Sequence, residues 1–348
     1  MNIGIIGCGA ISSQYMIGFE KNKTDVNVVA CADLDNEKSE LFAKEYNIEH
    51  LTVENLLSNP NIDIIVNLTP PSSHFEISCK SLKNEKHVFS EKPVALSVEQ
   101  GKKLYGLVNK HDRYLFSAPD TTLGPAFTKG QDLILSGKIG EIIGASASFA
   151  THGVEGWHPN PLFYYKKGGG PLFDMGPYYL TALLKILGPV NEIISYSQKT
   201  FPVRSVDNPK VKYKNIDVDV DTHYLALLKF KSGVVVDFEI SFDIWKPYEP
   251  KLEFYGSLSS IKFADPNNYD GDVSIFDKNS YRWEKVHSST NDENNYYRGL
   301  GVINMVKSIT ENNISQDEML LPFHVLEVMC ALETYDGKGR WEKINPQF

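Results

Sequence analysis

The chain opens with Met1-Asn2-Ile3-Gly4-Ile5-Ile6-Gly7-Cys8-Gly9-Ala10-Ile11-Ser12, in which an apolar run leads into closely spaced glycines and an amphipathic stretch. This order predicts a strand, a tight turn and a helix. Gly7 permits the turn, Gly9 lets a pyrophosphate approach the backbone, and the helix start at Ala10-Ile11 offers N–H groups to the phosphates. Ser12 replaces the last glycine of the Gly-x-Gly-x-x-Gly pattern. Taken alone, the motif also fits an ordinary strand-to-helix turn.

Strand-like and helix-like segments alternate throughout residues 1–119. The apolar runs are Asn2 to Gly7, Val26 to Ala32, Ile62 to Leu68, His87 to Ser90 and Tyr114 to Ala118. The amphipathic stretches are Ile11 to Lys21, Asn36 to Tyr46, Ser72 to Asn84 and Ser97 to His111. Such alternation predicts a doubly wound parallel sheet, the Rossmann arrangement that binds dinucleotides. We place the domain boundary at Pro119.

The pattern changes in residues 120–348, which we expect to form an α+β domain that binds substrate. Helices are predicted at Leu123 to Ser136, Pro177 to Leu187, Tyr297 to Ile309 and Pro322 to Thr334, and a polar loop at Ser288 to Asn295. Strands are predicted at Ile142 to Ala150, at Thr222 to Phe230 and Val234 to Phe242 joined by Lys231-Ser232-Gly233, and at Lys251 to Tyr255 paired with Ser260 to Phe263. This order indicates a large, mostly antiparallel open sheet with helices on one face. The bare face favours a homodimer or homotetramer.

Composition excludes several partners. The 348 residues are 42% apolar with a net charge of −9, and no cluster of basic residues occurs, so nucleic acid and anionic membranes are not expected to bind. No apolar run has the roughly 18 residues that a membrane span needs. The four cysteines lie far apart among apolar neighbours, which suggests reduced thiols in the cytoplasm. The nine histidines have no metal-binding spacing, so no metal is expected; the alternating Asp217-Val218-Asp219-Val220-Asp221 is interpreted as a solvated edge strand.

An acidic residue ends the predicted second strand. Asp33 follows Gly9 by 24 residues, where a carboxylate accepts hydrogen bonds from the adenosine ribose and repels a 2′-phosphate. This favours NAD over NADP. NADP remains the alternative because Lys38 offers a compensating charge. A purely structural role is also open, in which Asp33 or Asp35 caps the next helix.

Two further loops leave the carboxyl ends of predicted strands, where open α/β sheets bind ligands. The first is Asn67-Leu68-Thr69-Pro70-Pro71-Ser72-Ser73-His74, in which the prolines stiffen the turn and leave Thr69 to present its hydroxyl and backbone to the cofactor; Thr69, Pro70 and His74 are candidate cofactor contacts. The second is Glu91-Lys92-Pro93. Glu91 and Lys92 are further candidate cofactor contacts, and the lysine is positioned to hydrogen-bond the oxygen that changes between hydroxyl and carbonyl. A rigid loop and a solvated lysine are the plainer alternatives.

Three motifs in this order resemble the glucose-fructose oxidoreductase and inositol dehydrogenase family, also called Gfo/Idh/MocA. They are Gly7-x-Gly9, Glu91-Lys92-Pro93 and Gly168-Gly169-Gly170-Pro171-Leu172-Phe173-Asp174-Met175-Gly176. The resemblance implies a Rossmann domain followed by an α/β domain whose open sheet makes the oligomer interface. It also implies NAD(P)-dependent oxidation or reduction of sugars, cyclitols and their derivatives.

The resemblance also suggests catalytic residues. Lys92 matches the family's catalytic lysine, and Asp174 matches the acid of an aspartate-to-histidine motif spaced by one helical turn. Tyr178 stands where the family has histidine, so the chain departs from the pattern there. We hypothesise that Lys92 lowers the pKa of Tyr178 and polarises the substrate oxygen, while Asp174 orients both or binds a sugar hydroxyl. The alternative for Tyr178 is a packed core tyrosine.

A second candidate proton carrier is His158, within Trp157-His158-Pro159-Asn160-Pro161. Imidazole titrates near neutral pH, and Trp157 with the following Phe163-Tyr164-Tyr165 offers aromatic faces on which sugar rings stack. The loop is equally compatible with packing at the domain junction. The triple glycine at 168–170 is interpreted as letting the backbone approach cofactor or substrate, or as a flexible turn.

Two other activities are compatible with the same motifs. One is an NAD-retaining glycosidase that oxidises C3 transiently and returns the hydride. The other is a non-catalytic sugar or NAD sensor, which the presence of Lys92 disfavours.

Overall fold

The computed structural model describes residues 1–22, 26–245, 249–287 and 298–344. The chain divides into two compact units. The first comprises Met1–Leu123 and Asn291–Leu326 with Gln347–Phe348, and the second comprises Gly124–Thr290 and Glu327–Pro346. The division at Leu123 lies a few residues beyond the boundary expected at Pro119. It also assigns residues 291–326 to the first unit rather than to the second.

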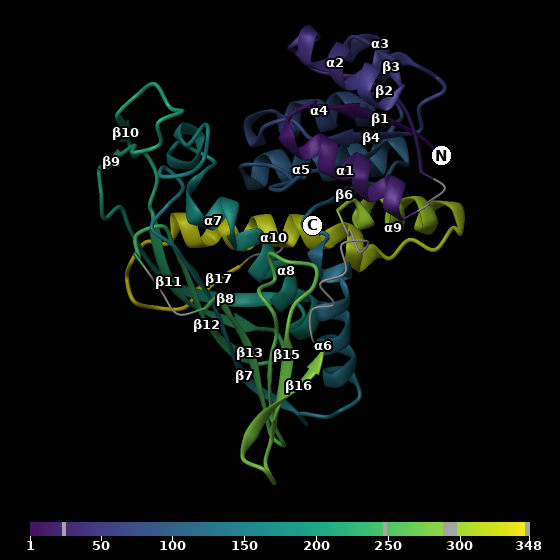
Figure 1. Cartoon of the computed structure of the whole chain (residues 1–348). Coiled ribbons are helices and arrows are strands. Elements are labelled where there is room, and N and C mark those ends of the chain that lie inside the picture. The colour runs from purple at the N-terminus through teal and green to yellow at the C-terminus, as the bar shows by residue number, and fades with distance from the viewer. Residues whose placement is uncertain (23–25, 246–248, 288–297, 345–348) are drawn as a thin grey trace. The chain divides into compact units, whose positions relative to one another are not determined.

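The first unit is built on a parallel six-stranded sheet with strand order β3-β2-β1-β4-β5-β6 (Figure 1). Its strands are β1 Asn2–Ile6, β2 Asn27–Ala32, β3 Glu49–His50, β4 Ile64–Asn67, β5 His87–Ser90 and β6 Leu115–Ser117. Its connecting helices are α1 Ala10–Lys21, α2 Asn36–Tyr46, α3 Val53–Ser58, α4 Pro71–Lys83 and α5 Val98–His111, followed by a short 3-10 helix at Thr121–Leu123. The order reverses beside β1, which confirms the predicted Rossmann sheet. β3 and α3 were not predicted.

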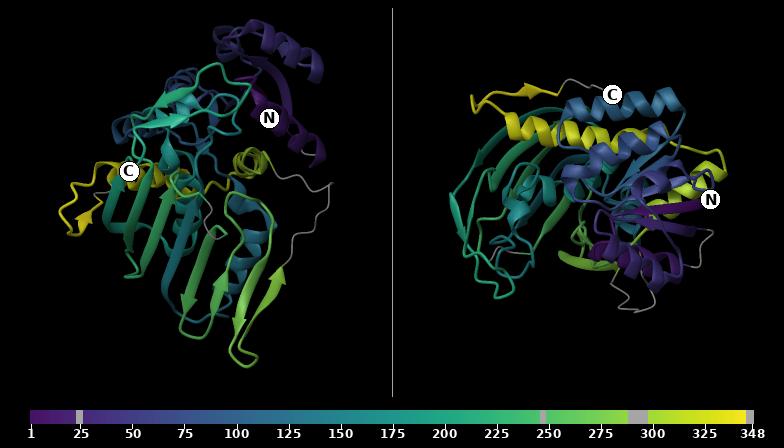
Figure 2. Two further views of the ribbon diagram at one scale, coloured as in Figure 1. Left: turned by 60° about the vertical axis from the view of Figure 1, so that its left-hand side comes forward. Right: turned by 90° about the horizontal axis from the view of Figure 1, so that it is seen from above.

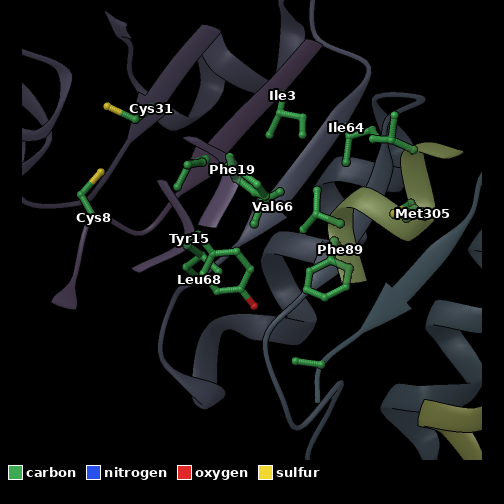
Figure 3. Close-up of a cluster of buried hydrophobic side chains, with 14 of the residues drawn as sticks. Ile3, Cys8, Tyr15, Phe19, Cys31, Ile64, Val66, Leu68, Phe89 and Met305 are labelled. Carbon is green, nitrogen blue, oxygen red and sulfur yellow. The ribbon is translucent and has the colours of Figure 1, made fainter. Parts of the chain in front are cut away.

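The core of this unit joins distant parts of the chain (Figure 3). Ile3, Val66 and Phe89 from the central strands are buried against Tyr15 of α1 and Met305 of α9. Helix α9 spans Leu300–Thr310, so residues near the end of the chain complete the hydrophobic core of the first unit. This packing explains why residues 291–326 belong to it.

The second unit contains a nine-stranded sheet with order β16-β15-β14-β13-β7-β12-β11-β8-β17 (Figure 2). Its strands are β7 Ile142–Ala150, β8 Val190–Gln198, β11 His223–Phe230, β12 Val235–Ser241, β13 Lys251–Gly256, β14 Ser260–Lys262, β15 Val273–Asp277, β16 Arg282–His287 and β17 Glu342–Lys343. Among the described strands, β7 and β12 pair in parallel and the other neighbours are antiparallel. The α/β class with a large mixed sheet is thereby confirmed. A separate ribbon pairs β9 Val203–Ser205 with β10 Asn215–Asp217.

Helices of the second unit are α6 Pro125–Leu135, α7 Gly170–Asp174 and α8 Gly176–Leu187, with a 3-10 turn at Leu162–Tyr165. Helix α10 runs from Gln316 to Thr334 and contains the division between the units. The sequence placed its start at Pro322, which is wrong because proline lies inside the helix. The helix begins earlier, where the Ser315 hydroxyl accepts a bond from the Glu318 N–H at 3.4 Å. The predicted polar loop at 288–295 lies outside the described residues.

The predicted strand through Asp217 to Asp221 is also wrong. β10 ends at Asp217, and the following acidic residues bind neighbours instead of continuing a ladder. Asp219 pairs with Lys166 at 2.9 Å, and Asp221 accepts a hydrogen bond from Ser197 at 2.5 Å. The alternation therefore reflects side-chain pairing along an irregular segment.

One face of the large sheet carries exposed aliphatic and aromatic side chains. On β8 and β11, Tyr196, Leu225 and Leu227 are 58%, 46% and 41% exposed, and their alternate neighbours Tyr224, Ala226 and Leu228 are buried. Tyr196 and Leu225 pair across the two strands. Among the described helices, none is long and apolar enough to cross a membrane.

Candidate functional site

The glycine turn after β1 has the form that a phosphate site requires. Gly7 has φ +102°, and a Cβ there would lie 2.6 Å from the Leu68 carbonyl carbon, so glycine is needed. Gly9 differs because a Cβ built on it comes within 4 Å of none of the described residues beyond its chain neighbours. Gly9 is the N-cap of α1, and no described side chain caps that end. The Ser12 N–H bonds the Gly9 carbonyl oxygen at 3.1 Å, and the open space beside Gly9 suits the approach of a pyrophosphate to the start of α1.

Asp33 is fixed beside this turn. Its Oδ2 accepts the Cys8 N–H at 2.7 Å, and its Oδ1 accepts the Asp35 N–H at 2.9 Å. Asp35, not Asp33, caps α2 by accepting the Lys38 N–H. Lys38 also pairs with Asp35 at 3.5 Å. Each Asp33 oxygen keeps a second lone pair, so the carboxylate can still accept hydrogen bonds from ribose hydroxyls.

The loop between β4 and α4 is held by His74. This residue is 1% exposed, with Nδ1 at 2.7 Å from the Pro93 carbonyl oxygen and Nε2 at 2.6 Å from the Thr69 carbonyl oxygen. Burial lowers the pKa of His74, while the two carbonyl acceptors and Glu91 act in the opposite direction. The Thr69 hydroxyl donates to Asn67 at 2.7 Å, so it serves the loop itself. His74 thus links the loop after β4 to the loop that carries Lys92.

Glu91 anchors the predicted lysine loop. Its Oε1 accepts the Tyr15 hydroxyl at 2.8 Å, its Oε2 accepts the Lys92 N–H at 3.1 Å, and Arg298 lies 4.0 Å away. Lys92 itself is half-buried. The sequence did not identify Tyr15 or Arg298, because both reach Glu91 only through the fold. The one sequence signal was Tyr15 on the inner face of the first helix.

In the second unit, His158 lies in the loop that follows β7. Its Nδ1 accepts the Asn160 N–H at 3.0 Å, so in the neutral ring the proton resides on Nε2. Burial lowers the pKa of His158 below its usual value, while Asp174 acts in the opposite direction. The neutral ring is therefore a hydrogen-bond donor at Nε2. This tautomer does not suit a general base.

The aromatic residues of this loop separate into two groups. Trp157 is 67% exposed and contacts the His158 ring edge-on at 5.4 Å between centroids, and Tyr164 does so at 4.9 Å. Tyr165 is fully buried, and its hydroxyl donates to Glu155. Trp157 and Tyr164 suit stacking on a sugar ring, whereas Tyr165 stabilises the loop from the protein interior through its hydrogen bond to Glu155.

The triple glycine leads into two short helices. A Cβ on Gly169 would collide with the backbone of Phe163 and Tyr164, so the close approach there is to the chain itself. Asp174 is the last residue of α7, and Tyr178 lies in the first turn of α8, with Met175 between the helices. The expected single helical turn between the two residues is therefore interrupted. Tyr178 is 7% exposed.

The predicted catalytic residues are divided between the two units. Lys92 belongs to the first unit, with Asp33, His74 and the glycine turn, whereas His158, Asp174 and Tyr178 belong to the second. Within the described ranges, no group of three or more potential metal ligands occurs.

Two family models match the chain. One, described as an oxidoreductase family with an NAD-binding Rossmann fold, covers residues 1–118, and the other, described as the GFO/IDH/MocA C-terminal domain, covers residues 127–262. The dTDP-3,4-didehydro-2,6-dideoxy-alpha-D-glucose 3-reductase of Saccharopolyspora spinosa is 31% identical over 273 residues, which are 75% of this chain and 74% of the relative. The myo-inositol 2-dehydrogenase of Thermotoga maritima is 24% identical over 76% of this chain and 75% of its own.

Solved structures share the fold over the full length. Levoglucosan dehydrogenase in complex with NADH and L-sorbose superposes with a TM-score of 0.83 at 19% identity, covering 100% of this chain and 99% of the other. An NAD binding oxidoreductase from Klebsiella pneumoniae gives a TM-score of 0.81 at 19% identity, covering 99% of each chain.

Proposed function

The chain belongs to the Gfo/Idh/MocA family of NAD-binding oxidoreductases, and from this premise we propose that it transfers a hydride between NAD and a secondary alcohol or ketone of a sugar, cyclitol or derivative. The observation that carries the proposal is the open, uncapped turn at Gly9 with Asp33 fixed beside it. The named activities of the relatives, a sugar-nucleotide reductase and an inositol dehydrogenase, support the substrate class.

The cofactor choice rests on Asp33. A carboxylate held by two backbone N–H groups has a fixed position at the end of β2. In that position it accepts the ribose hydroxyls of NAD and repels the 2′-phosphate of NADP. Lys38 is engaged with Asp35, which reduces its ability to offset this repulsion.

Each catalytic residue has a distinct proposed task. The bound nicotinamide supplies or accepts the hydride. The Lys92 ammonium holds the substrate oxygen and stabilises negative charge on it, and the Tyr178 hydroxyl carries the proton. His158 donates a hydrogen bond from Nε2 to a sugar hydroxyl, because its Nδ1 is occupied by the Asn160 N–H. Asp174 binds another hydroxyl or orients these groups, and Trp157 stacks on the sugar ring.

The assembly is a homodimer or homotetramer formed through the large sheet. The exposed side chains Tyr196, Leu225 and Leu227 support this, because monomeric proteins rarely leave such an aliphatic strand face in water. The compartment is the cytoplasm. None of the four cysteines, all within the described residues, forms a disulfide, which is compatible with a reducing environment.

The test is a panel of sugars, inositols and glycosides assayed with NAD and NADP at 340 nm. We expect NADH formation with at least one substrate, a preference for NAD of at least tenfold, and loss of activity in Lys92→Ala. The matched control Lys102→Ala, on the exposed side of α5, should retain activity. Cleavage of a glycoside without net formation of NADH would indicate the NAD-retaining glycosidase. NADH production that survives in Lys92→Ala contradicts the assigned role of that lysine.

A further inference from the structure

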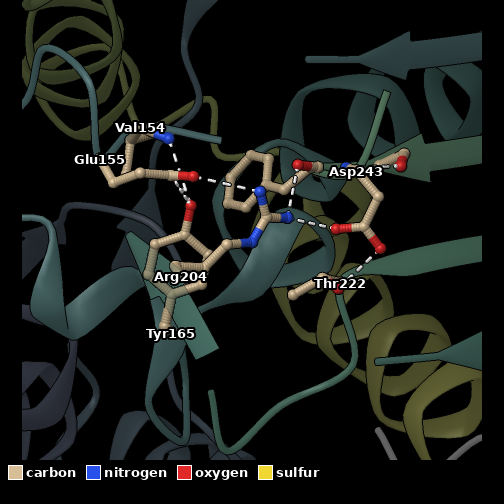
Figure 4. Close-up of polar contacts among 8 residues, drawn as sticks. Val154, Glu155, Tyr165, Arg204, Thr222 and Asp243 are labelled. Carbon is tan, nitrogen blue, oxygen red and sulfur yellow. Dashed lines mark hydrogen bonds and ion pairs between the residues drawn. The ribbon is translucent and has the colours of Figure 1, made fainter. Parts of the chain in front are cut away.

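Arg204 of β9 is a buried cation between two buried carboxylates (Figure 4). Its side chain is 3% exposed, and those of Glu155 and Asp243 are 9% and 6% exposed. Nη1 donates to Glu155 Oε1 at 3.1 Å, while Nη2 donates to the Phe242 carbonyl at 2.7 Å and to Asp243 Oδ1. One guanidinium therefore joins two acids that lie far apart in the sequence.

The partners of Arg204 tie together the segments at one end of the large sheet. Glu155 lies in the loop after β7, three residues before His158, and Asp243 follows β12. Tyr165, near the end of the same loop, donates its hydroxyl to Glu155 and accepts the Val154 N–H at 3.3 Å. The arginine thus fixes the loop near both its beginning and its end.

The segment around β9 and β10 holds this loop at further points. The Asn208 side chain donates to the His158 carbonyl at 2.9 Å, and the Tyr213 hydroxyl accepts the Leu162 N–H at 3.2 Å. The guanidinium carbon of Arg204 also lies 4.8 Å from the ring centroid of Phe201. Backbone and side-chain contacts therefore hold the loop from one side, with Arg204 supplying the charged anchor.

The geometry of the guanidinium matters here as much as its charge. Its planar fork reaches Glu155 with one nitrogen and Asp243 with the other, whereas a lysine ammonium is a point charge on a flexible chain. Removing the cation altogether would leave two buried carboxylates without their partner, a strongly destabilising change. Arg204→Lys keeps the positive charge but loses the planar fork. It therefore tests the effect of Arg204 on loop position separately from its effect on folding.

We infer that Arg204 is a positioning residue for the substrate: through Glu155 it fixes the loop that presents Trp157 and His158. This inference rests on the proposed function, in which that loop binds the sugar. Arg204 acts through the loop and not on the reacting atoms. It should therefore determine the affinity for the sugar and leave cofactor binding unaffected.

The test compares Arg204→Lys with Leu228→Ala. Leu228 is fully buried in β11, where it pairs with Val236 of β12 and Ile193 of β8, so its truncation destabilises the same unit through the sheet core. We expect Arg204→Lys to raise the KM for the sugar at least tenfold, to change kcat less than threefold, and to leave the Kd for NADH within twofold. Leu228→Ala should lower Tm without changing KM. A KM within twofold of wild type in Arg204→Lys overturns the inference.

A second pair of variants tests the same inference if Arg204→Lys does not fold. Gly153 has φ +79°, and a Cβ on it would collide with the Glu155 carboxylate and the Tyr165 hydroxyl. Gly153→Ala should therefore displace Glu155 and raise KM as well. The control is Gly144→Ala in β7, where a Cβ meets ordinary contacts beginning at 3.7 Å. Equal KM values in the two variants contradict the role of the Glu155 anchor.

Hydrogen–deuterium exchange tests the loop without any substrate. In Arg204→Lys, amides of residues 154–165 should exchange at least tenfold faster, with β11 unchanged. Unchanged exchange in the loop overturns the inference even if no sugar is turned over. If wild type turns over none of the sugars while exchange in the loop still increases, the proposed function fails and the structural anchor stands.

Discussion

His158 and Tyr178 are the two candidate proton carriers, and they differ in a way that bears on the proposed choice between them. A backbone N–H already occupies Nδ1 of His158, so the neutral ring presents N–H at Nε2. Burial lowers the pKa of His158, which favours the neutral ring. Tyr178, in the first turn of α8, presents a hydroxyl that can both donate and accept. We therefore keep Tyr178 as the proposed proton carrier, although imidazole titrates closer to neutral pH than phenol does.

This assignment predicts two different kinetic effects. Tyr178→Phe should lower kcat at least 100-fold, because it removes the proton carrier. His158→Gln should raise the KM for the sugar and lower kcat less than tenfold, with the acidic limb of the pH–kcat profile unchanged. The measurement is kcat from pH 5 to 10 for both variants. Disappearance of the acidic limb in His158→Gln would make His158 the base.

Single residues also show where sequence prediction reaches its limit. Asp33, Lys92 and the glycines could be proposed as site residues because each lies at the end of a predicted strand. Glu91 was identified by its motif, but its partners Tyr15 and Arg298 were not, since their contacts depend on packing between remote segments. Arg204 was missed for the same reason: its sequence neighbours contain none of the acids that it binds.

At the scale of elements, hydrophobic periodicity predicted the long segments well. The helix at Asn36–Tyr46 and the strands at Ile142–Ala150 and His87–Ser90 have the bounds that their patterns indicated. β3 has two residues and α3 has six, too few for a period to be recognised. In α10 the predicted start at Pro322 was wrong. Proline is common in the first turn of a helix, but here it lies inside the helix.

The junction of β5 and β6 contains a titratable group whose pH dependence can be predicted. His87 stacks on Tyr114 with a centroid distance of 5.2 Å, and its Nδ1 accepts the Tyr114 N–H at 3.1 Å. Burial, with Arg113 nearby, lowers the pKa of His87 to about 4. The folded protein therefore binds a proton at His87 only at lower pH than the unfolded chain does, because histidine in the unfolded chain titrates near pH 6.5.

As pH falls from about 6.5 to about 4, the unfolded chain takes up the His87 proton first, so the folded state loses stability. The loss is at most about 3.5 kcal/mol, from roughly 1.4 kcal/mol per pKa unit. His87→Gln should remove this contribution and flatten the dependence of unfolding free energy on pH in that range. Urea unfolding at a series of pH values measures it. An identical slope in wild type and variant would show that His87 is not the group responsible.

At the scale of the whole molecule, the sequence predicted two fold types and their order. It did not predict that residues near the end of the chain return to the first unit, because the apolar face of a helix does not by itself specify which core it joins. Nor could it show which face of the large sheet stays exposed. The alternation of buried and exposed residues in β11 is compatible with one covered face of the sheet, but the positions of the helices decide which face they cover.

The exposed sheet face predicts the outcome of a charge substitution. Introducing Leu225→Glu together with Leu227→Glu should place carboxylates on the proposed interface and convert the oligomer to monomers. Leu135→Glu, at the exposed end of α6, is the control and should leave the assembly intact. Sedimentation velocity at micromolar concentration distinguishes the two. Wild type sedimenting as a monomer would contradict the assignment of this face.

The central claim is that the turn at Gly9 binds the dinucleotide, and the most direct test is calorimetric titration with NADH of wild type and Gly9→Val. Among the described residues other than its own chain neighbours, none comes within 4 Å of a Cβ at Gly9, so valine should leave Tm unchanged, yet its side chain would occupy the space assigned to the pyrophosphate. We predict micromolar binding by wild type and at least 100-fold weaker binding by Gly9→Val. Equal affinities, or no uptake of NADH by wild type, would contradict the account.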